Sequence, residues 1–460
     1  MSGKHALVLA FSMLVLLFPA PAAAQVGVNR KHTETLLAPF PPDVYDSTMI
    51  SPDGRRIAYI KKSEAGQAAV LDGQAQKVYA RVAALTFSPD SKWMAYAASS
   101  GGRWFIVVDS REEPPYQRVG PPVFGPDSQR LAYVALRDDG KRMVVVNGKP
   151  GEPADRIFEG RIIFSPDGQR MAYGRRAGDK WYLVVDGQQG KPCDFLGSTT
   201  GIQFSPDGSR LAFAAKQGEK WCVVVDGQPQ KLYENVGTLA FGPNGKRTAY
   251  AAMTGSKWQV IVDGKPQKAY DAIGEDTIRF SPDGAHLAYA ARDGEKWFVV
   301  VDGQEGKHYD GIAQMLFSPD SGRLAYTVKL GTTEMVVVNT REQKLYDRVG
   351  GGTLVFSPDS QRLGYIARSG HVSFVVIDGK RKPRYDMVGY LNFTPDGRHY
   401  VYAAIRDDKT FTVVDDKEAA HRYDAIWNTP ASKFLFDTRK KFHYLAVKEG
   451  QMFLVEEEVD

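Results

Sequence analysis

Cysteine is nearly absent from the sequence. Only Cys193 and Cys222 occur among 460 residues, which excludes a disulfide framework and a zinc site of the Cys-x-x-Cys type. The two residues lie in consecutive copies of a repeat described below, so in an oxidising compartment they could form a disulfide bond. We expect instead two unpaired, buried thiols, because free cysteine packs as a small apolar side chain.

Long apolar runs are missing after residue 24. The one long run covers residues 6–18, with Lys4 and His5 before it, and prolines and the alanines of 22–24 after it. These are the features of a secretory signal peptide with an A-x-A cleavage site. We predict a signal peptide over residues 1–24 and a periplasmic or secreted protein without a membrane span, since no other segment approaches the about 20 apolar residues that a span needs.

A strong excess of one charge is also missing. The net charge is +5 and is spread without long runs of like charge, so the sequence carries no electrostatic footprint for nucleic acid. With 43% hydrophobic and 25% charged residues, 45 glycines and 26 prolines, the composition is that of a globular chain with many turns.

Catalytic motifs are missing as well. The chain contains neither G-x-S-x-G nor H-E-x-x-H, the motifs of common hydrolases and metallopeptidases. The histidines after residue 24 fall at scattered repeat positions, so we expect solvated side chains, no metal site, no cofactor and no enzymatic activity. They are His32, His286, His308, His371, His399, His421 and His443.

What the chain does contain is one repeat in many copies. The stretch 280–312 reads FSPDGAHLAYAARDGEKWFVVVDGQEGKHYDGI, in which apolar runs are separated by turn signals. Residues 281–284, Ser-Pro-Asp-Gly, fit a type I turn, because proline presets φ and aspartate bonds nearby backbone. Asp-Gly at 293–294 and 302–303 predicts two further turns between strands. The unit is therefore a four-stranded meander, and the turn aspartates have a structural role rather than a calcium-binding one.

Eleven copies of this unit fill residues 43–460, after a lead-in segment over residues 25–42 that has no period. The intervals between turn prolines are 37 to 40 residues, and the last unit, about 43 residues further on, is degenerate. The turn prolines are Pro52, Pro89, Pro126, Pro166, Pro206, Pro243, Pro282, Pro319, Pro358 and Pro395.

The two ends of the array predict how it closes. Tyr45-Asp46 matches the end of a fourth strand with no first three strands before it, and the last unit stops after its third strand, near Val455. An N-terminal strand that completes the last unit would remove both deficits and leave no open edge. The fold class is thus an all-β propeller of about eleven four-stranded repeats, either one large ring or two interlocked rings.

The repeat resembles a known family. The motif FSPDGxRLAY followed by VVVDG is similar to the TolB-type, WD-repeat-like propeller repeat of bacterial exported proteins and of the propeller domains of prolyl-oligopeptidase-like enzymes. The resemblance covers residues 43–456 and implies the propeller fold. It implies little about function, since one propeller fold serves many functions.

Five tryptophans share one position of the repeat, five residues before the turn aspartate of the third strand, and each follows a basic residue. Other units hold unrelated residues there, for example Arg142, so the fold does not require tryptophan. The indoles either cap the gaps between blades or form a basic, aromatic arc on one rim that binds a protein or a sugar. The binding hypothesis comprises Trp104, Trp181, Trp221, Trp258 and Trp297, with Lys180, Lys220, Lys257 and Lys296.

From the sequence we therefore expect an exported, non-enzymatic propeller that serves as a scaffold for a protein partner in the envelope or the extracellular space. The alternative is a carbohydrate or glycan binder that uses the tryptophan arc. A lyase or hydrolase with its site at the ring axis is the third hypothesis.

Overall fold

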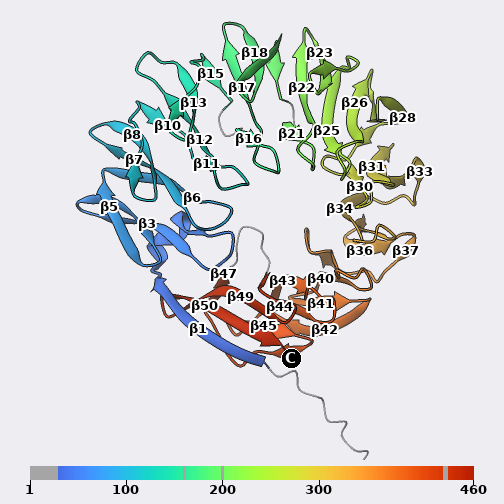
Figure 1. The fold of residues 1–460 in the computed structure, drawn as a ribbon. Coiled ribbons are helices and arrows are strands. Elements are labelled where there is room, and N and C mark those ends of the chain that lie inside the picture. The colour runs from blue at the N-terminus through green and yellow to red at the C-terminus, as the bar shows by residue number, and fades with distance from the viewer. Residues whose placement is uncertain (1–29, 159–161, 198–200, 428–433, 460) are drawn as a thin grey trace, which may run out of the picture.

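The protein forms one closed ring of antiparallel β-sheets (Figure 1). The computed structural model describes residues 30–158, 162–197, 201–427 and 434–459, so the expected signal peptide lies outside the described residues. Eleven sheets, the blades, follow one another around the ring. The all-β propeller is thereby confirmed, and of the two arrangements left open the structure has the single ring.

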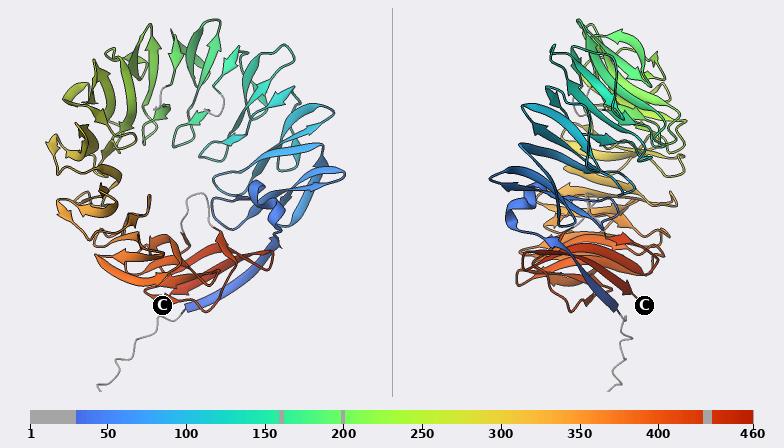
Figure 2. Two further views of the ribbon diagram at one scale, coloured as in Figure 1. Left: turned by 180° about the vertical axis from the view of Figure 1, so that it is seen from behind. Right: turned by 60° about the vertical axis from the view of Figure 1, so that its left-hand side comes forward.

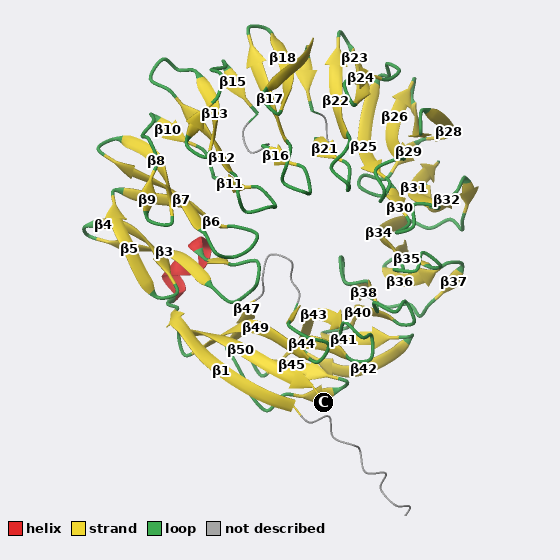
Figure 3. Ribbon diagram, viewed as in Figure 1, coloured by secondary structure: helices red, strands yellow, loops and turns green. Residues whose placement is uncertain are grey.

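Blade 6 shows the four-stranded plan of the blades, and in six other blades the first strand is divided into two short segments. Its strands run in the order β25 (Asn235–Phe241), β26 (Thr248–Thr254), β27 (Lys257–Val262) and β28 (Lys265–Tyr270), each paired with the next. The first strand lies toward the centre of the ring and the fourth at its outside (Figure 3). The predicted four-stranded meander is confirmed.

The second and third strands form the middle of each blade. In the other ten blades the second strands are β3 (Ile57–Ser63), β7 (Met94–Ser100), β12 (Leu131–Leu136), β17 (Met171–Ala177), β22 (Leu211–Gln217), β31 (Leu287–Asp293), β35 (Leu324–Leu330), β40 (Leu363–Ser369), β44 (Tyr400–Arg406) and β49 (Lys441–Lys448). The third strands are β4 (Gly66–Leu71), β8 (Arg103–Val108), β13 (Arg142–Val146), β18 (Lys180–Val185), β23 (Lys220–Val225), β32 (Lys296–Val301), β36 (Thr333–Val338), β41 (Val372–Ile377), β45 (Lys409–Val414) and β50 (Gln451–Val459).

The Ser-Pro-Asp-Gly segment is a turn, as predicted. Gly284 N–H donates to the carbonyl of Ser281 at 2.8 Å. One carboxylate oxygen of Asp283 accepts from the Ser281 hydroxyl and from the Ala285 N–H. The aspartate thus satisfies local donors, which is the structural role expected for an acidic residue in a turn.

Apolar side chains of neighbouring blades share each core cluster. Val260 of blade 6 and Val300 of blade 7 are both fully buried in one cluster, so the sheets of the two blades pack against each other. Cys193 and Cys222 are free and buried in another cluster, as expected. Burial raises the pKa of Cys193 to about 11, so its thiol is inert at neutral pH.

In several blades an arginine contacts the next blade on the side of the Ser-Pro-Asp-Gly turns. Arg210 stacks on the Phe241 ring of the following blade, 5.7 Å from its centroid, and donates to the carbonyl of Lys246 at 2.8 Å. His286 and His399 occupy this arginine position in two other blades and contact Asp302 and Asp415. The expectation that the histidines share no repeat position was therefore wrong for this pair. An imidazole can replace the guanidinium here because it can also pair with an aspartate.

The ring is closed by strand β1 (Arg30–Pro39), which pairs with β50 as the fourth strand of blade 11. In Figures 1 and 2 this blue strand lies along the red strands of the other chain end. Glu457 of β50 is 1% exposed and accepts from Thr412 at 2.6 Å and from Tyr444 at 2.7 Å. Arg30 of β1 forms an ion pair with the same carboxylate. Closure by an N-terminal strand is thus confirmed.

The prediction that the closing strand contains Tyr45 and Asp46 was wrong. Tyr45 and Asp46 belong to the short 3-10 helix η1 (Pro42–Ser47), and the strand is formed by the lead-in segment. Pro41 and Pro42 have no N–H to donate to a sheet, so the strand ends before them. The Tyr45 ring then packs at 4.9 Å from Phe40 and 5.1 Å from Trp427.

In the described residues no helix is long and apolar enough to cross a membrane.

Candidate functional site

The predicted tryptophans lie on one side of the ring, called here the hairpin face. It carries the hairpins that join the second and third strands, such as the turn between β26 and β27 (Figure 3). Trp181 is only 9% exposed. The other four indoles, at Trp104, Trp221, Trp258 and Trp297, are half-buried.

The indoles fill the seams between blades. A Cβ atom added to Gly237 of β25 would lie 3.3 Å from the Trp258 ring, so the glycine leaves room for the indole. Trp221 and Trp258 pack against core clusters that two neighbouring blades share. This packing supports the interpretation that tryptophan caps the gap between blades. Binding by the arc as a whole stays a prediction.

The lysines of the binding hypothesis are held by acidic residues. Lys257 donates to Asp271 at 2.6 Å, while the other carboxylate oxygen of Asp271 accepts from the Gly294 N–H of the next blade at 2.7 Å. We call this arrangement a carboxylate bridge. The Lys257 contact and the Gly294 N–H hold the pKa of Asp271 below its ordinary value. Equivalent pairs are Lys180 with Asp194, Lys296 with Asp310 and, at 3.7 Å, Lys220 with Glu234.

The seam between blades 3 and 4 departs from this pattern. Arg142 stands at the tryptophan position, and Ala154 stands where the bridged partner strand carries tyrosine in most blades. The inner strand of blade 3 is divided into β10 (Arg118–Val119) and β11 (Val123–Phe124) at a Gly-Pro-Pro segment, and the inner strands of blades 4, 5, 7, 9 and 11 are divided as well. What distinguishes this seam is the smaller side-chain volume at Ala154, beside which the seam stays partly open.

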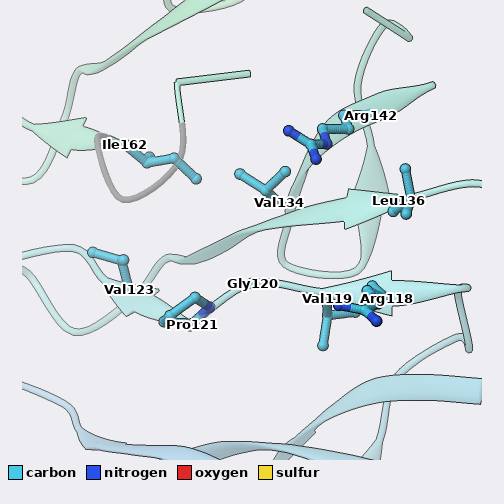
Figure 4. A pocket seen from close by; sticks show the side chains of 9 residues that line it. All are labelled: Arg118, Val119, Gly120, Pro121, Val123, Val134, Leu136, Arg142 and Ile162. Carbon is cyan, nitrogen blue, oxygen red and sulfur yellow. The ribbon is translucent and has the colours of Figure 1, made fainter. Parts of the chain in front are cut away.

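Two adjoining hollows occupy this seam. The first has a volume of about 250 Å³, and in Figure 4 Ile162 of blade 4 faces Val134 across it, with the Arg142 guanidinium beside them. Its lining residues are Arg118, Val119, Gly120, Pro121, Val123, Val134, Leu136, Arg142 and Ile162. The second, of about 590 Å³, is lined by Leu136, Gly140, Arg142, Asp155, Arg156, Ile157, Phe158, Trp181 and Phe195. Because Leu136 and Arg142 border both, we treat them as one site, the seam hollow.

The seam hollow combines positive charge with aromatic surface. Arg118, Arg142 and Arg156 line it. The one acidic residue in the lining, Asp155, forms an ion pair with Lys141, and its carboxylate accepts a hydrogen bond from the Gly178 N–H at 2.7 Å. Arginine guanidinium groups recognise carboxylates and other anions in a directional way. The rim therefore suits a negatively charged group.

An aromatic group forms the floor of the second hollow. Trp181 lies 5.1 Å from Phe158 and 5.9 Å from Phe195, between ring centroids, and Phe195 is 40% exposed. Of the residues in the binding hypothesis, the structure places Trp181 in this site. The three arginines were missed, although the alanine at 154, where most repeats carry tyrosine, was a signal that could have identified the seam.

A second polar group deviates from the sequence expectation. Among the described residues, His32, Glu34 and His421 each offer a donor atom within 4.8 Å of the other two. Burial favours a higher pKa for Glu34, but hydrogen bonds from Tyr423 and His32 lower it below its ordinary value. The carboxylate is therefore ionised at neutral pH. Two histidines far apart in the sequence thus meet, which the repeat positions alone did not predict.

Comparison with known proteins gives no family for this chain. No protein-family model and no curated protein matches the sequence. Among solved structures, a eukaryotic initiation factor has 14% identity and a TM-score of 0.40 over 73% of this chain and 96% of its own. TolB from Acinetobacter baumannii has 16% identity and a TM-score of 0.24 over 54% and 77%. Hydrazine synthase of Kuenenia stuttgartiensis has 14% identity and a TM-score of 0.28 over 56% and 95%. At these values the similarities carry no inference about function.

Proposed function

We propose that the protein is a non-enzymatic interaction scaffold that binds a protein partner at the seam hollow. The observation that carries the proposal is the pair of hollows between blades 3 and 4, where Ala154 stands in place of the tyrosine of most blades and three arginines line an apolar seam. A pocket that takes an apolar anchor inside a charged rim is a typical interaction hot spot. The proposal includes export to the periplasm or the extracellular space, on the strength of the expected signal peptide.

The chemistry of the hollow defines the partner segment. An apolar or aromatic side chain would enter between Val134 and Ile162, and adjacent acidic residues would meet Arg118 and Arg156. The Nε of Arg175, buried without a hydrogen-bond partner in the described part of the chain, supports an anion at this seam. Arg175 pairs in register with Ile157, which lines the hollow.

The test uses a displayed library of random peptides selected on the full mature chain. We expect enrichment of segments in which an apolar or aromatic residue is flanked by aspartate or glutamate. Binding of such a peptide, measured by fluorescence anisotropy, should weaken at least about tenfold in the double variant Arg118→Glu, Arg156→Glu, because like charges then face each other.

Arg348→Glu is the matched control. Arg348 occupies the same repeat position in blade 9, follows its Tyr-Asp pair and is 75% exposed at its side chain. This variant should bind the peptide like the unaltered protein. Equal binding by all three proteins would contradict the site, and a tryptophan fluorescence response to glycans alone would favour the carbohydrate-binding alternative.

A further inference from the structure

The outer edges of neighbouring blades are joined by a recurring three-residue contact. Lys268 and Tyr270 of blade 6 both reach Glu305 of blade 7, at 2.6 and 2.9 Å. We call this contact the outer clamp. It recurs as Lys77, Tyr79 and Glu112, and as Lys307, Tyr309 and Glu342. In each clamp the lysine stands two residues before the tyrosine.

The seam that closes the ring has an altered outer clamp. Tyr423 of blade 10 donates to Glu34 of β1 at 2.6 Å, so tyrosine and glutamate are kept. The lysine position holds His421, whose Nδ1 lies 3.8 Å from the Glu34 carboxylate. A second imidazole, His32 of β1, places its Nε2 at 3.1 Å from Glu34 and 3.2 Å from the Tyr423 hydroxyl.

We propose that His32, Glu34 and His421 bind a divalent transition metal ion, with Zn²⁺ as the expected occupant. Two imidazole nitrogens and one carboxylate oxygen are a ligand set that zinc accepts, and water can fill the fourth position. The Tyr423 hydroxyl, which donates to Glu34, would orient the carboxylate as an outer-shell partner. Among the described residues, the Nδ1 of His32 is buried without a hydrogen-bond partner, so none of them holds this ring by a polar contact on that side.

Metal binding requires one local movement. The His32 and His421 rings are stacked with centroids 3.5 Å apart and planes 9° from parallel. Imidazole lone pairs lie in the ring plane, so an ion shared by both nitrogens requires the rings to tilt out of the stack. The His421 side chain is 47% exposed and that of His32 is 14% exposed, so most of this movement falls to His421.

The ion would join the two ends of the ring. His32 and Glu34 lie on the N-terminal strand β1, whereas His421 precedes the inner strand β47 (Ala425–Trp427) of blade 11 and follows blade 10. A ligand that binds only the folded state stabilises that state by an amount that grows with the logarithm of the ligand concentration relative to Kd. Zinc would therefore stabilise closure of the ring, a role separate from the seam hollow and independent of the proposed partner.

The experiment titrates ZnCl₂ into untagged, chelator-stripped mature protein in competition with a chromophoric chelator, and records the melting temperature in parallel. We expect one tightly bound Zn²⁺ per chain and an increase in melting temperature that EDTA reverses. His421→Lys restores the outer clamp of the other blades, so it should fold normally yet bind at least about tenfold more weakly. His32→Asn should show the same loss, and His371→Ala, on an exposed hairpin, should not.

Equal zinc affinity in the unaltered protein and in His421→Lys would overturn the proposal. So would a stoichiometry near zero, or a rise in melting temperature that His421→Lys retains in full. The His421→Lys variant carries the lysine that three other clamps of the same chain have, so its ring should close normally. An unchanged melting temperature without metal would show this closure, and a loss of zinc binding would then come from the loss of the imidazole ligand.

Discussion

Gly284 adopts a backbone conformation that most residues avoid. Its φ is +74°, and an added Cβ would lie 3.3 Å from the ring of Pro243 in the preceding blade. Gly284→Val should therefore lower the free energy of unfolding by about 1–3 kcal/mol, the usual cost of a strained residue. Urea denaturation measures this change.

Gly284→Ser provides the control, because serine already occupies this turn position with positive φ at Ser91, Ser128, Ser321 and Ser360. Ser321 also accepts a hydrogen bond from the Asp283 N–H of the preceding blade at 3.0 Å. We expect the serine variant to lose less than half as much stability as the valine variant. Equal losses would show that steric contact with Pro243, and not φ, sets the cost.

The tryptophans should contribute to stability according to their burial. Trp181→Ala removes a buried indole and should cost about 3–5 kcal/mol, the range for large core truncations. The double variant Trp221→Ala, Trp258→Ala, which removes two half-buried indoles, should cost less per residue. Chemical denaturation gives both values, and a negligible loss of stability in the double variant would support the exposed binding arc.

How far the sequence predicts a residue's role depends on whether the repeat dictates it. The turn position of Asp283 was assigned correctly because its partners lie within the same turn. The carboxylate bridge at Asp271 was not, because its second partner, Gly294, belongs to another blade. Contacts between blades depend on the geometry of the ring, which no single repeat contains.

At the scale of elements, β1 is the strand with the most distant partner. It pairs with β50 along almost its whole length, and a buried ion pair, Arg30 with Glu457, lies in this sheet. Deletion of residues 25–39 should expose the edge of β50, lower the melting temperature and cause aggregation. Light scattering and calorimetry measure both effects; a deletion variant that stays monomeric with an unchanged melting temperature contradicts closure by β1.

Arg30→Ala is a milder version of the same test. Removing one partner of a buried ion pair typically costs about 3–5 kcal/mol, since the other charge stays buried. A second change, Glu457→Gln in the same chain, should restore part of the loss, which a double-mutant cycle would reveal. The strand itself was not predicted, because most of its side chains are exposed and it therefore shows no alternation of apolar and polar residues.

At the scale of the whole molecule, carboxylate bridges connect many blades. Contacts with lysine and with backbone N–H groups lower the pKa of Asp155, Asp194, Asp271 and Asp424. A group with a lowered pKa in the folded state stabilises that state at neutral pH, and this stabilisation is lost as the pH falls through the lowered value. The urea midpoint should therefore drop steadily on acidification below about pH 4.

Asp271→Asn serves as the check on this pH dependence. The amide keeps an acceptor for the Gly294 N–H and removes the titrating group, so the variant should be less stable at pH 7 and should lose less on acidification. A midpoint that is the same at pH 3 and pH 7 in the unaltered protein would contradict the role of the bridges.

The number of rings, by contrast, had no signature in the sequence, since the repeats are evenly spaced and a ring of eleven differs from two smaller rings only in the angle between blades.

The pairing of the first described strand with the last also affects how two copies of the chain can interact. The fourth-strand position of blade 11 can be filled by β1 of its own chain or by β1 of another copy, because the sheet contacts are the same in both cases. Exchange of a terminal element is a common route to dimers. Refolding at high concentration should therefore yield domain-swapped dimers, which persist on dilution until β1 is released, whereas dilute refolding should yield monomeric rings.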